Sequence, residues 1–310
     1  MNQSLIGIEI GGTKLQVVLG DSDGQILDRR RFYVDRDLGA HGIRDQIESA
    51  LTEFLKEGNK TVAVGVGFGG PVDRATGEIA CSHQISGWSG FPLAAWLKER
   101  TRLPVTVDND ANVAALGEAV LGAGKGSNPV FYVTLGSGVG GGAVVDGSIH
   151  HGAQPGESEI GHLRLDRSGS IVEQECSGWA VDLKIRNAIK KEPGSLLAQC
   201  VGDRTSNEAK FLGKALDSQC PLAQSILGET AQSLAFALSH VTHLFHPETI
   251  IIGGGLSMLG EKLITSVASE FQKYLMEIFL PGPNIKLAQL QEDTVPIGAL
   301  LMANQSLSNL

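Results

Sequence analysis

Paired cysteines, long apolar runs and an excess of positive charge are all missing from this sequence. The four cysteines, Cys81, Cys176, Cys200 and Cys220, lie far apart and form no C-x-C or C-x-x-C pair. That usage is typical of a reducing compartment and supplies no zinc knuckle. The first residues lack the basic region and apolar core of a signal peptide, and no apolar run approaches the ~20 residues that span a bilayer. We therefore expect a cytoplasmic protein with no membrane partner.

Acidic residues outnumber basic ones, and the net charge is −9. Binding to a nucleic-acid backbone requires Lys and Arg to replace counterions, so we expect no nucleic-acid partner. The acidic balance does not argue against a nucleotide, because backbone N–H groups can hold phosphates without basic side chains.

Glycine, in contrast, is abundant. The 310 residues include 40 glycines, about double the average share of roughly 7%, and many of them cluster. A chain of this length is long for one core, so we expect two domains or one large α/β unit. The domain boundary is predicted at a tight crossover near Leu121–Gly126.

Two glycine clusters follow the same pattern of strand, glycine turn and strand. Residues 5–19 contain Gly11-Gly12-Thr13, and residues 130–145 contain Gly136-Ser137-Gly138. The repeat suggests a duplicated domain, although glycine is also the default residue of ordinary tight turns. A third glycine turn, 253–255, follows the apolar run 249–252, and a helix is predicted over 257–275.

Glycine turns after buried strands are typical of a nucleotide cradle, because glycine lets backbone N–H groups approach a phosphate closely. No Walker A loop occurs. The letters G-x-G-x-x-G do occur at 136–141, but a strand is expected after them instead of a helix. A dinucleotide-binding dehydrogenase is therefore disfavoured.

A further turn follows the short apolar run 105–107, where Asp108, Asn109 and Asp110 precede an alanine-rich helical pattern. Asp and Asn are favoured at helix N-caps, so these residues can simply cap a helix. Alternatively, Asp110 is a general base at the edge of the sheet where α/β proteins bind ligands. The turn alone does not decide between the two interpretations.

Taken in order, several motifs of this chain resemble those of the ROK family, which contains sugar kinases, sugar-responsive repressors and proteins of unknown role. The matching segments run from residue 6 to about 300 and are Ile8–Lys14, Gly69–Asp73, Asp108–Asn112, Thr134–Gly142, Glu159–His162 and Ile251–Gly255. Each motif is weak by itself, but their order along nearly the whole chain is specific.

The resemblance implies an α/β protein with the actin-like (ribonuclease H-like) ATPase fold, whose two domains bind a hexose in the cleft between them. We expect residues 1–118, with a C-terminal helix at about 294–310, to form the smaller α/β domain. Residues 119–293 would form the larger one.

The resemblance also implies site residues. Asp110 would be the catalytic base, and Lys14 would reach a phosphate unless it lies on a solvated strand face. The expected sugar contacts are Gly70, Gln84, Asn109, Glu159, His162 and Glu173. The expected nucleotide contacts are Gly11, Gly12, Thr13, Lys14, Thr134, Gly136, Ser137, Gly138, Gly254 and Gly255. Read alone, Glu159 and Glu173 would be solvated loop residues, and His162 a hydrogen-bonded loop histidine.

Three positions depart from the family pattern. Glu9 stands where family kinases usually have an Asp that helps to order Mg²⁺, and its extra methylene displaces the carboxylate by about 1 Å, an error that can cost ~10²-fold in rate. Gln84 stands where the family often has Asn, which leaves the sugar open. The cysteine cluster that binds zinc in many members is replaced, with Ile171 at its last position and Cys176 outside it. We predict no zinc site, because one cysteine and one histidine do not make a tetrahedral site.

The resulting hypothesis is a hexose kinase that uses ATP and Mg²⁺, with the 6-hydroxyl of glucose as the expected acceptor. A fructokinase or a kinase of N-acetylglucosamine or N-acetylmannosamine is the alternative, and polyphosphate could replace ATP. A non-catalytic sugar-binding protein and a repressor are the rivals. A family repressor carries an N-terminal helix-turn-helix, whereas the first strand here is expected near Leu5. Monomer and homodimer both stay open.

Overall fold

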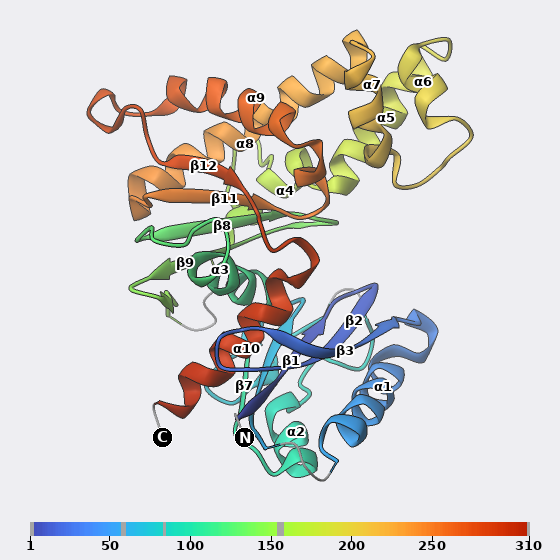
Figure 1. Ribbon diagram of the computed structural model, residues 1–310. Helices are drawn as coiled ribbons and strands as arrows, with labels where there is room; N and C mark the ends of the chain where they lie inside the picture. Colours follow the sequence, from blue (N-terminus) through green and yellow to red (C-terminus); the bar gives the residue numbers. More distant parts are fainter. Residues whose placement is uncertain (1–2, 57–59, 83–84, 154–157, 309–310) are drawn as a thin grey trace. The chain divides into compact units, whose positions relative to one another are not determined.

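The computed structural model describes residues 3–56, 60–82, 85–153 and 158–308 (Figure 1). The chain divides into two compact units. Unit 1 comprises 1–126, 142–158 and 289–310, and unit 2 comprises 127–141 and 159–288. The domain bounds expected from the sequence stay a prediction.

Unit 1 contains a five-stranded sheet of order β3-β2-β1-β4-β7. Its strands are β1 (Ser4–Ile10), β2 (Lys14–Gly20), β3 (Ile26–Tyr33), β4 (Thr61–Phe68) and β7 (Val105–Asn109). The first three form an antiparallel meander, as the turn residues between them predict. Strands β4 and β7 continue the sheet in parallel with β1.

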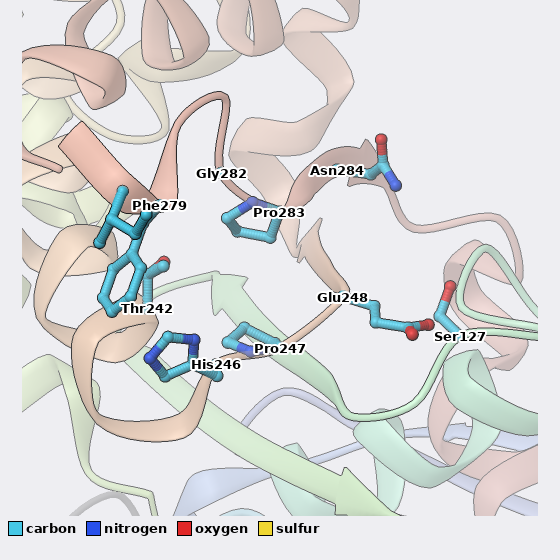
Figure 2. A pocket seen from close by; sticks show the side chains of 10 residues that line it. Ser127, Thr242, His246, Pro247, Glu248, Phe279, Gly282, Pro283 and Asn284 are labelled. Atoms are coloured by element: carbon cyan, nitrogen blue, oxygen red, sulfur yellow. The ribbon is translucent and has the colours of Figure 1, made fainter. Parts of the chain in front are cut away.

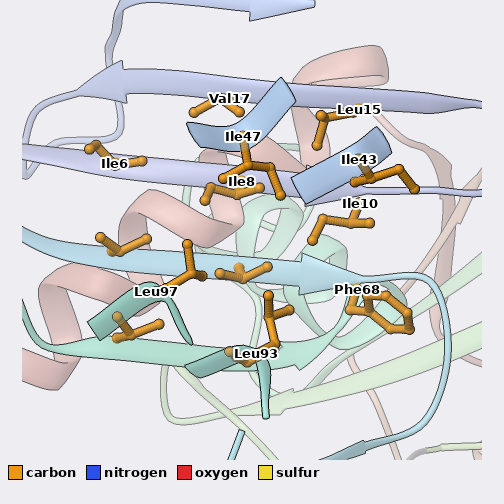
Figure 3. Packing of buried hydrophobic residues seen from close by; sticks show 14 of the residues in the cluster. Ile6, Ile8, Ile10, Leu15, Val17, Ile43, Ile47, Phe68, Leu93 and Leu97 are labelled. Atoms are coloured by element: carbon orange, nitrogen blue, oxygen red, sulfur yellow. The ribbon is translucent and has the colours of Figure 1, made fainter. Parts of the chain in front are cut away.

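Alternation of side chains along β1 buries both faces of this sheet. Ile6, Ile8 and Ile10 pack in one apolar cluster with α1 (Gly39–Phe54) and α2 (Leu93–Thr101), as Figure 3 shows for Ile43, Ile47, Leu93 and Leu97. On the opposite face, Leu5 packs against Leu300 of α10 (Thr294–Leu307). Two covered faces explain why β1 and β4 read as nearly continuous apolar runs.

Helix α10 also packs against α3 (Asp110–Val120), and glycine permits the close approach. A Cβ atom on Gly298 would lie 1.9 Å from the backbone oxygen of Val113. The contact holds α3, and hence the β7–α3 turn at its start, against the sheet.

The second sheet has the order β10-β9-β8-β11-β12. Its strands are β8 (Val130–Leu135), β9 (Val139–Val145), β10 (Ser148–Ile149), β11 (Thr249–Gly253) and β12 (Asn284–Leu287). Strands β8, β11 and β12 run parallel within unit 2. The expectation that a strand follows the G-x-G letters at 136–141 is confirmed, because β9 begins at Val139.

The helices of unit 2 are α4 (Val172–Cys176), α5 (Gly178–Lys191), α6 (Leu196–Val201), α7 (Leu212–Asp217), α8 (Pro221–Phe245) and α9 (Glu261–Phe271). Helix α8 begins at a proline, which is tolerated there because the first N–H needs no partner within the helix. The prediction of a single helix over 257–275 is wrong. A 3₁₀ turn (Gly255–Leu259) ends at Gly260, whose φ of 64° is outside the helical range, and α9 starts after it.

Within the described residues, no helix has both the length and the apolar character required to cross a membrane.

Candidate active site

The predicted site residues of unit 1 that the structure describes gather at one edge of its sheet. Strands β1, β4 and β7 are parallel, and their carboxyl ends lead into the glycine turn at 11–13, Gly69-Gly70 and the β7–α3 turn. The register places Phe68 beside Asn109 and beside Ile10. Ligands bind at such an edge in open α/β sheets.

Asn109 is the N-cap of α3. Its Oδ1 accepts hydrogen bonds from the backbone N–H groups of Ala111 at 2.9 Å and Asn112 at 3.4 Å, and its Nδ2 donates to the backbone oxygen of Gly70 at 3.2 Å. The capping interpretation therefore holds for Asn109. The amide also ties the β7–α3 turn to the β4 turn.

Asp110 is the first residue of α3, so its carboxylate lies at a helix N-terminus, where a negative charge is favoured. A Cβ atom on Gly69 would lie 3.3 Å from Asp110 Oδ2. The glycine thus leaves room for this carboxylate beside the end of β4.

Asp108 is buried and bound on both oxygens. Its Oδ1 accepts from Asn109 N at 2.7 Å and from Asn112 Nδ2 at 3.0 Å. Its Oδ2 lies 2.5 Å from Nε2 of His151, in the segment after β10. No local pattern could have paired two residues 43 positions apart.

Glu9 projects from β1 and is largely buried. Its Oε2 accepts a hydrogen bond from Gln16 Nε2 at 2.7 Å and lies 3.3 Å from Lys14 Nζ. Burial raises the pKa of Glu9 above 4.5, and the positive charge of Lys14 opposes that rise. Lys14 and Glu9 therefore form an ion pair in this structure.

The first glycine turn is a tight hairpin between β1 and β2. Gly11 N donates to Lys14 O at 3.0 Å, and Thr13 O accepts from Val34 N at 3.1 Å. The Nε of Arg36 donates to Gly12 O at 3.4 Å. These carbonyl contacts fix the direction of the turn's backbone.

In unit 2, the other two glycine turns meet at the carboxyl ends of β8 and β11. Thr134 pairs with Gly253 in the sheet. A Cβ on Gly254, whose φ is 80°, would lie 2.5 Å from the backbone of Leu135. Gly136 N donates to Gly138 O at 3.0 Å, and Gly178 N, at the start of α5, donates to Gly136 O at 2.7 Å. Two predicted nucleotide-binding turns and a helix N-terminus are thus adjacent within unit 2.

The predicted sugar-binding residues of unit 2 lie at the start of β9. Glu173 Oε2 accepts from Val139 N at 2.9 Å. Gly161 packs against Val139, since a Cβ there would lie 2.1 Å from Val139 O. Glu159 and His162 flank Gly161, with 3.5 Å between Glu159 Oε2 and His162 Nδ1. The structure therefore brings all three predicted side chains of this unit to one strand end.

Two predictions are not tested by these contacts. Gln84 lies outside the described residues. The prediction that the chain holds no zinc stays a prediction, although in the described part of the chain no three His, Cys, Asp or Glu side chains form a metal-binding group. Cys176 is buried, and its thiol donates to Thr230 O at 3.6 Å.

Unit 2 also has a cavity of about 450 Å³ that contains none of the predicted site residues (Figure 2). Its lining includes Pro247 and Glu248, just before β11, and Asn284, the first residue of β12. The cavity therefore lies at the amino ends of these strands, whereas the glycine turns lie at their carboxyl ends.

Comparison with known proteins decides the family. The model of the ROK family matches residues 5–306. The chain belongs to the ROK family. It is 32% identical to a glucokinase of Halalkalibacterium halodurans, over 97% of this chain and 94% of that protein. It is also 32% identical to a glucokinase of Thermotoga maritima, over 95% of each chain.

A solved ROK member gives the structural comparison. The ROK family glucokinase of Streptomyces griseus, determined in complex with glucose and AMPPNP, superposes with a TM-score of 0.84. It is 32% identical to this chain, and the match covers 97% of this chain and 99% of that one. The predicted fold, an α/β protein of the actin-like ATPase type, is confirmed, and the described residues form two five-stranded sheets and a small two-stranded one.

Proposed function

We propose that this ROK protein is a hexose kinase that transfers the terminal phosphoryl group of ATP to the 6-hydroxyl of glucose. The observation that carries the proposal is the placement of Asp110 at the start of α3, beside Gly69 and next to the capping residue Asn109. Glucose and AMPPNP are bound in the solved Streptomyces griseus glucokinase, which is 32% identical. Both observations support a sugar and a nucleotide as ligands.

Asp110 would accept the proton of the attacking hydroxyl. A positioned general base contributes about 10²–10⁴-fold, and phosphoryl transfer depends mainly on orientation and charge stabilisation. Asn109 keeps its Oδ1 on the helix N-terminus, so its own sugar contact would come from the amide group that now reaches Gly70 O. The cap and the sugar contact therefore involve the same side chain.

Glu159, His162 and Glu173 would bind other hydroxyls of the sugar. Carboxylates accept hydrogen bonds and imidazole can donate or accept, which suits a ligand whose hydroxyls do both. A site that hydrogen-bonds hydroxyls also rejects analogues that lack one, because its polar groups are then left unpaired. Gly70 and Gln84 complete the proposed sugar contacts.

The glycine turns would hold the nucleotide. The close packing of Gly254 on Leu135 and of Gly178 on Gly136 leaves no room for side chains, so the backbone itself would face the phosphates. The expected contacts are those of the first turn (Gly11, Gly12, Thr13 and Lys14), with Thr134, Gly136, Ser137 and Gly138, and with Gly254 and Gly255.

Glu9 fits a role toward Mg²⁺, because Mg²⁺ in kinases is held by one or two carboxylates together with substrate phosphates. The ion would neutralise charge on the transferred phosphoryl group. In this chain Glu9 is oriented by Gln16 and Lys14, and a bound ion would compete with Lys14 for Oε2.

A coupled assay over a hexose panel tests the proposal, with glucose, fructose, mannose and the N-acetylhexosamines as acceptors and ATP, GTP and polyphosphate as donors. We expect glucose with ATP to give the highest kcat/KM. Faster turnover of another hexose would replace the substrate while keeping the reaction. Sugar binding by calorimetry without turnover of any acceptor would overturn the kinase proposal in favour of a sensor.

A further inference from the structure

The carboxylate of Asp108 connects the proposed catalytic turn to a distant segment of unit 1. Only 5% of Asp108 is exposed. Its Oδ1 accepts from the backbone of Asn109 at 2.7 Å and from the side chain of Asn112 at 3.0 Å. These two bonds lie on either side of Asp110, so Asp108 braces the residues that hold the proposed base.

Among the residues that the structure describes, the contact to the other oxygen of Asp108 comes from one side chain. His151 Nε2 lies 2.5 Å from Oδ2. A carboxylate can only accept hydrogen bonds, so this pair requires a form of His151 that carries a hydrogen on Nε2. A carboxylate buried to this degree is costly unless it is paired and hydrogen-bonded. His151 is the group that supplies this partner.

His151 itself is fixed by its neighbours in the chain. His150 N donates to Ala143 O of β9 at 2.8 Å. Gly152 O accepts from Arg74 Nη2 at 3.2 Å. The backbone on both sides of His151 is therefore tethered within unit 1. The imidazole is therefore held through its own backbone and not only by its contact with Asp108. It can consequently fix the position of the Asp108 carboxylate.

We propose that His151 is a positioning residue for the phosphoryl transfer: through Asp108 it holds the 108–112 turn so that Asp110 stays in register with the sugar hydroxyl. The catalytic part of this inference rests on the proposed function. Misplacement of a reacting group by about 1 Å can cost ~10²-fold, whereas of the proposed sugar and nucleotide contacts Asn109 alone lies in this turn. Loss of His151 should therefore lower kcat much more than it changes KM.

His151→Ala should therefore lower kcat about 10- to 100-fold, with KM for glucose and ATP changed less than about threefold. His151→Gln can place an amide N–H near the position of Nε2 and should recover most of the loss. His41→Ala removes an exposed imidazole on α1 that pairs with Asp45 and has no part in the proposed network, so it should leave kcat unchanged. Asp108→Asn combined with His151→Ala should be no worse than the worse single variant, because both act through one contact.

Amide hydrogen exchange provides a measurement that does not need turnover. The N–H groups of Ala111 and Asn112 bond to Asn109 Oδ1 and so report on the turn. We expect faster exchange at 111–112 in His151→Ala, and none of this acceleration in His41→Ala or His151→Gln.

Unchanged exchange in His151→Ala, an equal loss of kcat in His41→Ala, or a loss confined to KM would each overturn the inference. If the wild-type protein turns over no sugar, the proposed function fails separately. The exchange comparison then still decides whether His151 holds the turn.

Discussion

Gln16 and Glu9 lie opposite each other on β2 and β1, and the Gln16 amide donates a 2.7 Å hydrogen bond to Glu9 Oε2. Gln16 is fully buried. Its own oxygen accepts from Arg29 Nη1 at 3.1 Å and Arg31 Nε at 2.8 Å, so the amide can only present its NH₂ group toward Glu9. The longer carboxylate at this position is therefore held by a defined partner.

Burial of Glu9 predicts a specific pH dependence of stability. Because desolvation raises the pKa of Glu9 above 4.5, the folded protein binds this proton more tightly than the unfolded chain does. The contribution of Glu9 is most favourable below pH 4.5 and is lost as the pH rises through the raised value. The free energy of unfolding of Glu9→Gln, taken relative to that of the wild type, should therefore be more favourable at pH 8 than at pH 4.5. Urea unfolding at both pH values measures this, and a difference that is constant or reversed would contradict it.

Asp110→Asn tests the proposed base directly. The amide keeps the shape of the side chain but cannot accept the sugar proton, so kcat should fall by about 10²–10⁴-fold. Glucose affinity, measured by calorimetry, should change little, because the proposed sugar contacts are retained. Asp45→Asn, at an exposed carboxylate on α1, is the matched control and should behave as wild type. A variant with more than a tenth of wild-type kcat would remove Asp110 from this role.

The β7–α3 turn shows how far local sequence reasoning reaches. Asn109 caps α3 through the next two residues, and such a contact is encoded within the turn itself. The bond between Glu9 and Gln16 could also have been found, because a tight hairpin at 11–13 fixes which residues of β1 and β2 face each other.

Other features depend on packing that the sequence pattern does not encode. His151 reaches Asp108 only after β9 and β10 have folded back toward α3. The helix predicted over 257–275 was too long because its apolar spacing continues through Gly260, and a glycine is compatible with either a helix or a break. The actual break follows from the backbone conformation of that residue.

Glu118 should be a large contributor to the stability of unit 1. Its fully buried carboxylate accepts from the backbone N–H groups of Ala123 at 2.9 Å, Gln289 at 3.1 Å and Leu290 at 2.8 Å. Each buried donor left without a partner costs about 1–3 kcal/mol. Glu118→Ala should therefore lower the free energy of unfolding by about 3 kcal/mol or more, and Glu118→Gln by less. Urea unfolding measures the change, and the exposed Glu99→Gln is the control, which should alter the free energy of unfolding little. An effect of Glu118→Ala as small as that of the control would contradict the prediction.

Two helical glycines should respond to alanine with opposite signs. In a helix interior, alanine is more favourable than glycine by about 1 kcal/mol. At Gly298 the new Cβ would lie 1.9 Å from Val113 O, so α10 must move and overpacking should cost about 1–3 kcal/mol or more. At Gly228 of α8 nothing lies within 4 Å, so the helical preference should prevail. Thermal unfolding of Gly298→Ala and Gly228→Ala should therefore shift the Tm down and up, and shifts of the same sign would disprove the packing argument.

The prediction that this chain holds no zinc rests on the state of Cys176 as well as on the missing cysteine cluster. Burial raises the pKa of the Cys176 thiol to about 12, so it stays protonated, and a zinc ligand must be a thiolate. His162, whose side chain is 69% exposed, faces Glu159 at 3.5 Å. Protein purified without chelators should contain only substoichiometric zinc by elemental analysis. Its native Cys176 should also react with a thiol reagent far more slowly than the partly exposed Cys81 and Cys200. One zinc per chain that is lost in both His162→Ala and Cys176→Ser would show that this region binds the metal after all.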